Sequence, residues 1–120
     1  MATEIRTVPE LVPYTLWQGD TWSPGTVTCD IGGTVINFTG YDAKMEIRTA
    51  LSGDLITTLT DASGIMLGSD GTIVISMTAA QTNAIAAGEY KYDLQITDTN
   101  GAITTYFYGT FTVLSDTTAN

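Results

Sequence analysis

Charged and apolar residues alternate over positions 43–48, and the charged ones are the first candidates for a specific chemistry. They are Lys44, Glu46 and Arg48. A β-strand turns every second side chain to the same face, so these three would share one face while the apolar residues face a core. Such a face is either solvated or holds cross-strand ion pairs that contribute about 0.2–1 kcal/mol each. A functional patch is the alternative interpretation.

Few residues of this chain are suited to acid–base or nucleophilic catalysis. It has no histidine and a single cysteine, Cys29, which lies in a strand pattern typical of a small buried side chain. A general base at neutral pH would have to be a carboxylate or lysine with a shifted pKa. Eight of the nine aspartates are instead spread singly and are expected in turns, at Asp20, Asp30, Asp42, Asp54, Asp61, Asp70, Asp98 and Asp116. We therefore predict that the protein is not an enzyme.

Metal and phosphate sites are not indicated either. The segments DASG at 61–64 and DTNG at 98–101 each offer an aspartate near a glycine. Neither has the spacing of a calcium loop, which needs about five ligand positions across a dozen residues. No Lys-Ser/Thr pair follows a glycine-rich turn between a strand and a helix, so a phosphate loop is excluded. The sequence predicts no metal and no cofactor.

Aromatic residues are the stronger candidates, because tyrosine and tryptophan are enriched in protein interfaces and in sugar-binding platforms. Tyr106 and Tyr108 alternate with apolar residues near the end of the chain and are predicted to face outward. Trp17 and Trp22 flank a Gln-Gly-Asp turn. The alternatives are that the tryptophans belong to the core and that the tyrosines only cover an outer sheet face. The interface candidates are Pro9, Leu11, Pro13, Trp17, Trp22, Tyr106 and Tyr108.

Short strands separated by turn residues must position these side chains. The expected strands cover 14–18, 21–29, 34–38, 43–48, 54–60, 65–67, 72–77, 89–97 and 102–114. One helix is expected over 78–88, because Thr78 and Gln81 have capping-box spacing and Gly88 can end it. The core face of the last strand is predicted to comprise Ile103, Thr105, Phe107, Phe111 and Val113.

The expected fold is all-β, an immunoglobulin-like β-sandwich with one short helix and an extended N-terminal arm. The segment GEYKYDL resembles the penultimate strand of immunoglobulin-like domains. Tyr90 would be the corner tyrosine, and Tyr92 stands where disulfide-forming domains have cysteine. The predicted parts are an arm at 1–13, a sandwich at 14–114 and a polar tail at 115–120. The proline-containing arm either packs on its own domain or reaches a neighbour.

Composition and charge limit the partners. The 120 residues suit one domain, and 43% are hydrophobic while 14% are charged. The net charge of −9 disfavours binding to nucleic acid or to an anionic membrane. The negative charge either keeps the protein soluble or attracts a partner with a basic surface. The N-terminal segment does not read as a signal peptide, and no apolar run reaches the roughly 18 residues that span a bilayer. We expect synthesis in a cytoplasm.

Four segments in a fixed order carry a resemblance to a known family. They are GDTWS, FTGYDAKMEIR, GTIVISMTAAQTNAIAAGEYKYDLQITDTNG and GTFTVL. Each is weak alone, and their order over residues 15–114 resembles small structural proteins of tailed bacteriophages. The resemblance implies a virion protein, made in the host cytoplasm, that assembles with other virion proteins as a homo-oligomer or symmetric array.

Two roles on the particle are compatible with this resemblance. One is an adaptor at the neck, the tail or a fibre attachment site, and the other is a capsid decoration protein. The alternative from a different functional class is a carbohydrate-binding β-sandwich module, which the aromatic residues would serve.

Overall fold

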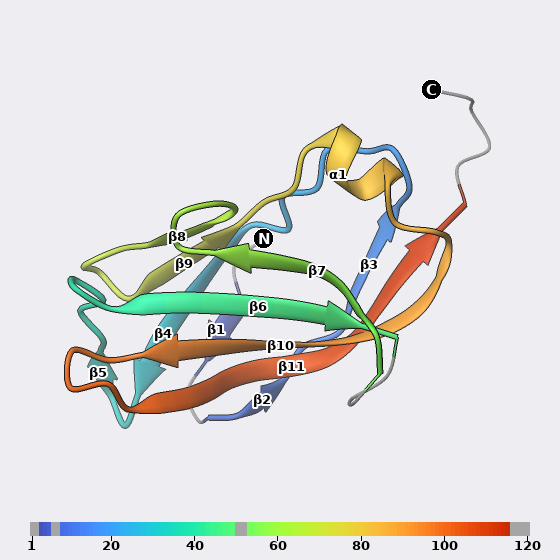
Figure 1. The fold of residues 1–120 in the computed structure, drawn as a ribbon. Coiled ribbons are helices and arrows are strands. Elements are labelled where there is room, and N and C mark those ends of the chain that lie inside the picture. Colours follow the sequence, from blue (N-terminus) through green and yellow to red (C-terminus); the bar gives the residue numbers. More distant parts are fainter. Residues whose placement is uncertain (1–2, 6–7, 50–52, 116–120) are drawn as a thin grey trace.

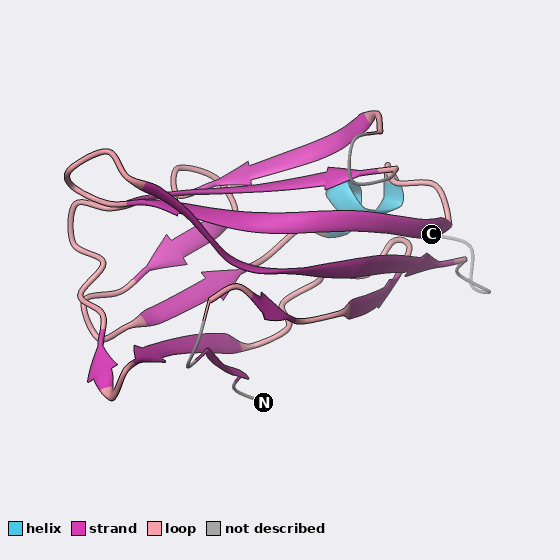
Figure 2. Cartoon of the chain, turned by 90° about the horizontal axis from the view of Figure 1, so that it is seen from below, coloured by secondary structure: helices cyan, strands magenta, loops and turns pink. Residues whose placement is uncertain are grey.

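The computed structural model describes residues 3–5, 8–49 and 53–115, which form two facing β-sheets (Figures 1 and 2). The first sheet has the order β1 (Thr3–Ile5), β4 (Thr26–Ile31), β9 (Thr72–Ile75) and β8 (Ile65–Leu67), with β5 (Thr34–Val35) paired to β4. In the second sheet, β11 (Ile103–Leu114) pairs with β10 (Gly88–Thr97), β10 pairs with β6 (Asp42–Arg48), and β6 pairs with β7 (Leu55–Thr60). The other side of β11 pairs with β2 (Glu10–Leu11) and β3 (Tyr14–Trp17).

This strand order is that of an immunoglobulin-like sandwich. The strands β4, β9 and β8 correspond to the B, E and D strands, and β7, β6, β10 and β11 correspond to C′, C, F and G. The prediction of an all-β sandwich with one short helix is confirmed. The interior is apolar because alternate residues of β6 and β10 are buried, namely Ala43, Met45, Ile47, Tyr90, Tyr92, Leu94 and Ile96.

Two tyrosines of β10 bind backbone oxygens. The Tyr90 hydroxyl donates to the carbonyl of Ala86, four residues upstream, which is the corner arrangement that the sequence predicted. The Tyr92 hydroxyl donates to the carbonyl of Val12. Burial raises the pKa of Tyr92, so it stays a neutral donor. Tyr92 therefore links the centre of the second sheet to the N-terminal segment.

The helix α1 (Ala79–Asn83) begins with the predicted capping box. The Thr78 side chain accepts from the Gln81 amide at 3.2 Å, and the Gln81 side chain accepts from the Thr78 amide at 2.8 Å. The helix ends at Asn83 and not near Gly88, so the predicted length is wrong. Buried Thr82 binds the turn after β3, since its hydroxyl donates to the Asp20 carbonyl at 2.7 Å. The helix is thereby held at the end of the sandwich where β3 ends (Figure 1).

The described part of the N-terminal arm lies against its own chain. Strand β1 pairs in parallel with β4 of the first sheet, and β2 and β3 pair in parallel with β11 of the second. The Val12 amide also donates to the Tyr108 carbonyl at 2.8 Å. The segment therefore crosses from one sheet to the other. The boundaries predicted at 13 and 114 stay predictions, and most of the predicted tail lies outside the described residues.

Candidate interaction surface

Trp22 lies in the core, so the prediction that it is available to an interface is wrong. Only 7% of the residue is exposed. Its ring meets Tyr14 edge-on at 5.1 Å between centroids and Phe111 at 5.2 Å. Its backbone forms a two-way bridge to Met77, with both N–H···O distances at 2.9 Å. The alternative interpretation, that this tryptophan is a core residue, is the one that the structure supports.

Tyr106 also faces inward, and the physical reason is a β-bulge. Leu94 lies opposite Phe107 and Gln95 lies opposite Thr105, so Tyr106 is an extra residue in the ladder. Tyr106 and Phe107 consequently both enter the core, and only 8% of Tyr106 is exposed. Burial raises the pKa of its hydroxyl. The outward orientation predicted for Tyr106 is wrong.

The same bulge reverses the faces of the residues that precede it. Ile103 was predicted to belong to the core, but it is 65% exposed. It pairs with Thr97 on the outer side of the second sheet. One inserted residue shifts every earlier side chain of the strand to the opposite face, because the period of a strand is two.

Leu11 and Tyr108 form the exposed apolar pair among the predicted interface residues. They lie opposite each other in the parallel ladder between β2 and β11, with 63% of Leu11 and 37% of Tyr108 exposed. Pro9 and Pro13 are exposed beside them, next to β2 in sequence. Trp17 is 46% exposed but lies opposite Leu114. Six residues of strand, about 20 Å, separate that position from Tyr108.

Two carboxylates continue the line of the Leu11–Tyr108 pair across the sheet. Asp93 of β10 is opposite Tyr108, and Glu46 of β6 is opposite Asp93. Partial burial and the neighbouring Glu46 raise the pKa of Asp93, while Arg48 and Lys44 offset part of this rise. Sequence reasoning missed Asp93. The alternation of EYKYDLQIT places it outward, but only the register shows that it lies between Tyr108 and Glu46.

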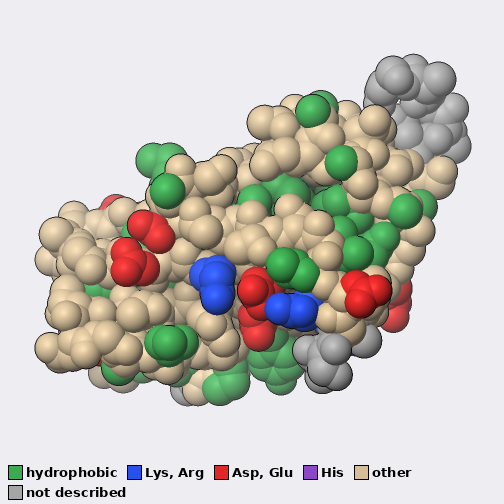
Figure 3. All heavy atoms as spheres, viewed as in Figure 1, with side chains coloured by type: hydrophobic (Ala, Val, Ile, Leu, Met, Phe, Trp, Pro, Cys, Tyr) green, Lys and Arg blue, Asp and Glu red, His purple; other side chains and the backbone are tan. Residues whose placement is uncertain are grey.

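Among the residues that the structure describes, the ion pairs on the charged face of β6 lie along that strand and not across strands. Glu46 accepts from the Arg48 guanidinium at 3.0 Å, and the Lys44 ammonium lies 3.8 Å from the same carboxylate. Lys91 of β10 donates to the Thr110 hydroxyl at 3.0 Å. All lysines and arginines of the described ranges lie on this outer face. Figure 3 shows positive and negative side chains side by side over its middle.

Comparison with known proteins identifies a shared fold. The N-terminal domain of phage TP901-1 ORF48 is similar to this chain with a TM-score of 0.51 and 11% identity, over 96% of this chain and 94% of that one. CopC from Methylosinus trichosporium OB3b gives a TM-score of 0.39, with 15% identity over 65% and 67% of the two chains. Drosophila OTK extracellular domains 3–5 give 0.35, with 18% identity over 92% and 35%.

The likeness to the phage domain extends over nearly all of both chains, so this protein has the fold of a phage protein domain. That bears out the coarser part of the resemblance read from the motif order. The sequence matches no protein-family model and no curated protein.

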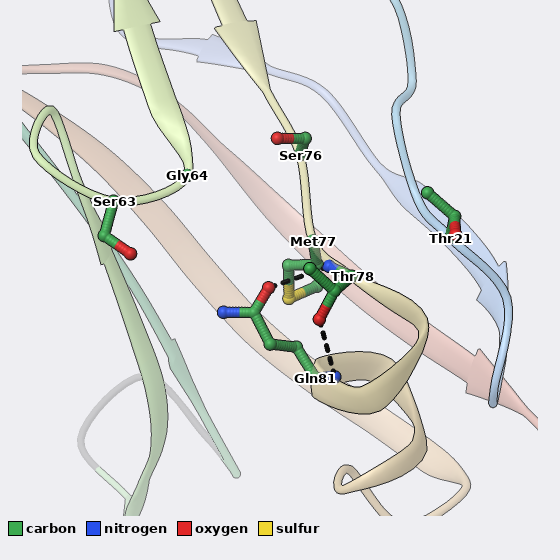
Figure 4. Close-up of a pocket in the computed structure, with 7 residues that line it drawn as sticks. All are labelled: Thr21, Ser63, Gly64, Ser76, Met77, Thr78 and Gln81. Atoms are coloured by element: carbon green, nitrogen blue, oxygen red, sulfur yellow. Dashed lines mark hydrogen bonds between the residues drawn. The ribbon is translucent and has the colours of Figure 1, made fainter.

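A shallow depression of about 330 Å³ lies between the N-terminus of α1 and the end of β9. It is lined by Thr21, Ser63, Gly64, Ser76, Met77, Thr78 and Gln81 (Figure 4). Thr78 and Gln81 use polar atoms for the capping box, drawn as dashed lines there. No aromatic or charged side chain lines it, so it lacks the stacking platform that sugar binding would use.

Two further findings concern the described residues alone. Within 3–5, 8–49 and 53–115, no group of three or more His, Cys, Asp or Glu side chains could hold a metal ion. Nor does any helix in these ranges have the length and apolarity needed to cross a membrane.

Replacing Asp93 by asparagine is expected to stabilise the protein at neutral pH. The folded-state pKa of Asp93 is raised, chiefly by burial, so the folded protein retains this proton to higher pH than the unfolded chain does. The free energy of unfolding therefore falls as the pH rises from about 3.9, the ordinary pKa of an aspartate in the unfolded chain, through the raised pKa of the folded state. Asparagine avoids that loss.

Chemical denaturation of the wild type and Asp93→Asn between pH 3 and pH 7 checks this expectation. The two free energies of unfolding should be close at the acid end, and the variant should gain an advantage as the pH rises. A variant that is less stable than the wild type at pH 7 would show that attraction to Arg48 and Lys44 outweighs burial and the repulsion from Glu46.

Proposed function

We propose that this chain is a non-enzymatic structural component of a tailed-phage particle that binds other virion proteins. The observation that carries the proposal is the exposed Leu11–Tyr108 pair at the edge of the second sheet. The fold shared with a phage protein domain along nearly the whole chain supports it. So does the order of the motifs between residues 15 and 114.

The surface around this pair has the composition of a protein interface. Leu11 and Tyr108 supply exposed apolar area, and Asp93 and Glu46 continue the same line with negative charge. A virion protein with a basic rim around an apolar contact would complement it. The role is that of an adaptor at the neck, tail or fibre attachment site, or of a capsid decoration protein in a symmetric array.

The double variant Leu11→Ser/Tyr108→Ser is expected to fold normally and to lose incorporation into phage particles by at least about tenfold, since truncated anchors cost 1–2 kcal/mol or more. Both side chains are exposed, so the free energy of unfolding should change little. Ile103→Ser is the matched control, because it removes an exposed apolar side chain from the same strand. Equal incorporation of wild type and double variant would remove the pair from the interface.

Antibody labelling of purified particles, viewed by electron microscopy, tests the proposal as a whole. Label on the capsid would support a decoration protein, and label at the neck or tail would support an adaptor. Absence of label from every part of the particle would overturn the virion proposal.

A carbohydrate-binding module is the second candidate, because Trp17 and Tyr108 are aromatic side chains exposed on a β-sandwich. A glycan array separates the two functions. Binding that is lost in Trp17→Ala would support the carbohydrate function, and signals at background level would count against it.

A further inference from the structure

The outer face of the second sheet carries charges whose sign alternates along its strands. The pairing of β6 with β10 sets the charged residues in rows that run across these two strands. In order along the strands, the rows hold Asp42, then Lys44, then Glu46 with Asp93, then Arg48 with Lys91, and then Glu89. The five rows are therefore negative, positive, negative, positive and negative.

This face holds most of the positive charge of the chain. Of the thirteen acidic and four basic residues in the sequence, four acids and three bases lie in these rows. Nine acids and one base remain elsewhere. A second copy carries the same excess of negative charge and is repelled least at this face. Two copies can therefore approach each other most closely through these rows.

The two central rows present accessible charges. Glu46 and Arg48 pair with each other at 3.0 Å, yet their side chains keep 26% and 34% of their exposure. Among the described residues Asp93 takes part in no ion pair, and Lys91 donates to the Thr110 hydroxyl at 3.0 Å. Charges of opposite sign on a facing surface would thus find partners in both rows.

We propose that two copies of this chain pair through these outer faces about a twofold axis. The axis lies between the two facing sheets, perpendicular to the strands, and passes between the row of Glu46 and the row of Arg48. Each strand then lies over the same strand of the second copy and runs in the opposite direction. Glu46 meets Arg48 of the second copy, and Asp93 meets Lys91 of the second copy, so the central contacts join opposite charges.

Charge complementarity selects this orientation. With the axis along the strands, every row would lie over the same row of the second copy, and acids would face acids. An axis through a row, instead of between two rows, also sets rows of the same sign opposite each other. Packed sheets cross at about 30°, so the rows next to the axis keep their partners while the outer rows shift sideways. The pairing therefore depends chiefly on the two central rows.

The size of the face suits a small interface. Neighbouring strands lie about 4.8 Å apart and the rows about 6.8 Å apart, so β7, β6, β10 and β11 present roughly 20 Å by 30 Å. Pairing would bury roughly 1,200 Å² in total, near the lower limit of specific interfaces. Leu55 and Tyr108 add exposed apolar area on either side of the central rows. Because charges carry the central contacts, we expect a reversible dimer that salt weakens.

A second copy would be one of the virion proteins that bind this chain, so the inference rests on the proposed function for its biological role. Its test uses the isolated protein and is independent of that role. A monomeric protein that is incorporated into particles would overturn the pairing and leave the virion function standing. A dimer that is absent from particles would do the reverse.

Sedimentation velocity of the isolated protein tests the pairing. At about 200 µM protein and about 20 mM salt, the wild type should sediment as a dimer. Raising the salt to about 500 mM should weaken the dimer at least about tenfold, because screening then acts over a few ångströms. A monomer under both conditions would overturn the proposal, and a dimer insensitive to salt would contradict its charge-based orientation.

Two charge-reversed variants identify the face. Arg48→Glu/Lys91→Glu makes both central rows negative, and Glu46→Lys/Asp93→Lys makes both positive. Each variant alone should be a monomer, because like charges then face each other about the axis. An equal mixture of the two should form a dimer again, since every central contact joins opposite charges. A mixture that stays monomeric would overturn the proposed face.

Asp20→Lys/Asp70→Lys is the matched control, because it has the same net charge as the positive variant but changes exposed residues outside the rows. It should sediment as a dimer, and a monomer would show that net charge and not the rows controls association. Circular dichroism checks that each variant folds. If a reversed variant does not, Arg48→Gln/Lys91→Gln introduces no like charges and should still weaken the dimer about tenfold. An unweakened dimer in that variant would contradict the central contacts.

Discussion

Replacing Trp22 by alanine is expected to lower the free energy of unfolding by about 3–5 kcal/mol, the range for losing a buried large aromatic side chain. The ring lies edge-on between Tyr14 and Phe111, and 7% of the residue is exposed. These neighbours belong to β3 and β11, so the cavity would open where the N-terminal segment meets the second sheet. Urea denaturation followed by circular dichroism measures the loss.

Trp17→Ala is the matched control, because it removes the same side chain from the other end of the same turn. This residue is 46% exposed, and the expected change is below about 1 kcal/mol. A loss for Trp17→Ala as large as that for Trp22→Ala would contradict the assignment of one tryptophan to the core and the other to the surface.

The two tryptophans show where sequence reasoning stops. Both flank the turn at Gly19-Asp20, and local pattern gives no reason to treat them differently. Trp22 enters the core because its backbone bridges Met77, and Trp17 lies at the end of a strand that pairs with β11. Both facts depend on pairing between distant segments, which alternation within one segment does not encode.

Strict alternation did predict the faces of β6 and β10, and with them the core and the fold class. It failed on β11, since nothing in the residues around Tyr106 marks the bulge. Glycine and proline, the usual signals of irregularity in a strand, are not next to this position. As a result, Tyr106 was wrongly predicted to face solvent, and Ile103 was wrongly predicted to face the core.

The candidate surface was predictable in part. Tyr108 is exposed, as the alternation of its strand predicted, and the interface candidates Leu11 and Trp17 are exposed as well. Asp93 could not be placed beside Tyr108 without the register of β10 and β11, which the bulge at Tyr106 adjusts. The position of β7 at the end of its sheet likewise follows from strand order, which depends on contacts between strands far apart in sequence.

Gly109→Ala is expected to destabilise the protein by about 2–4 kcal/mol, through steric overlap and a lost buried hydrogen bond. A β-carbon at this position would lie 2.8 Å from the Val12 oxygen and 3.3 Å from the Pro13 nitrogen. Both are backbone atoms, so the N-terminal segment has to move away from β11. That movement separates the Val12 carbonyl from the buried Tyr92 hydroxyl.

Gly88→Ala is the control that isolates this overlap. Gly88 and Gly109 have φ values of +158° and +159° and lie in the two strands of one hairpin, so any backbone effect is common to both. A β-carbon on Gly88 would meet its nearest neighbour, the Tyr90 ring, at 3.9 Å, which is ordinary contact. We expect Gly88→Ala to change stability by less than about 1 kcal/mol.

Hydrogen exchange at the Val12 amide distinguishes displacement of the N-terminal segment from general destabilisation. This amide donates to the Tyr108 carbonyl at 2.8 Å and should be protected in the wild type and in Gly88→Ala. In Gly109→Ala it should exchange faster by more than the change in global stability explains. Because Leu11 lies next to Val12, the proposed virion function predicts that the same variant also weakens incorporation into particles. Retained protection at Val12 would show that the segment stays in place and that the strain is absorbed by β11.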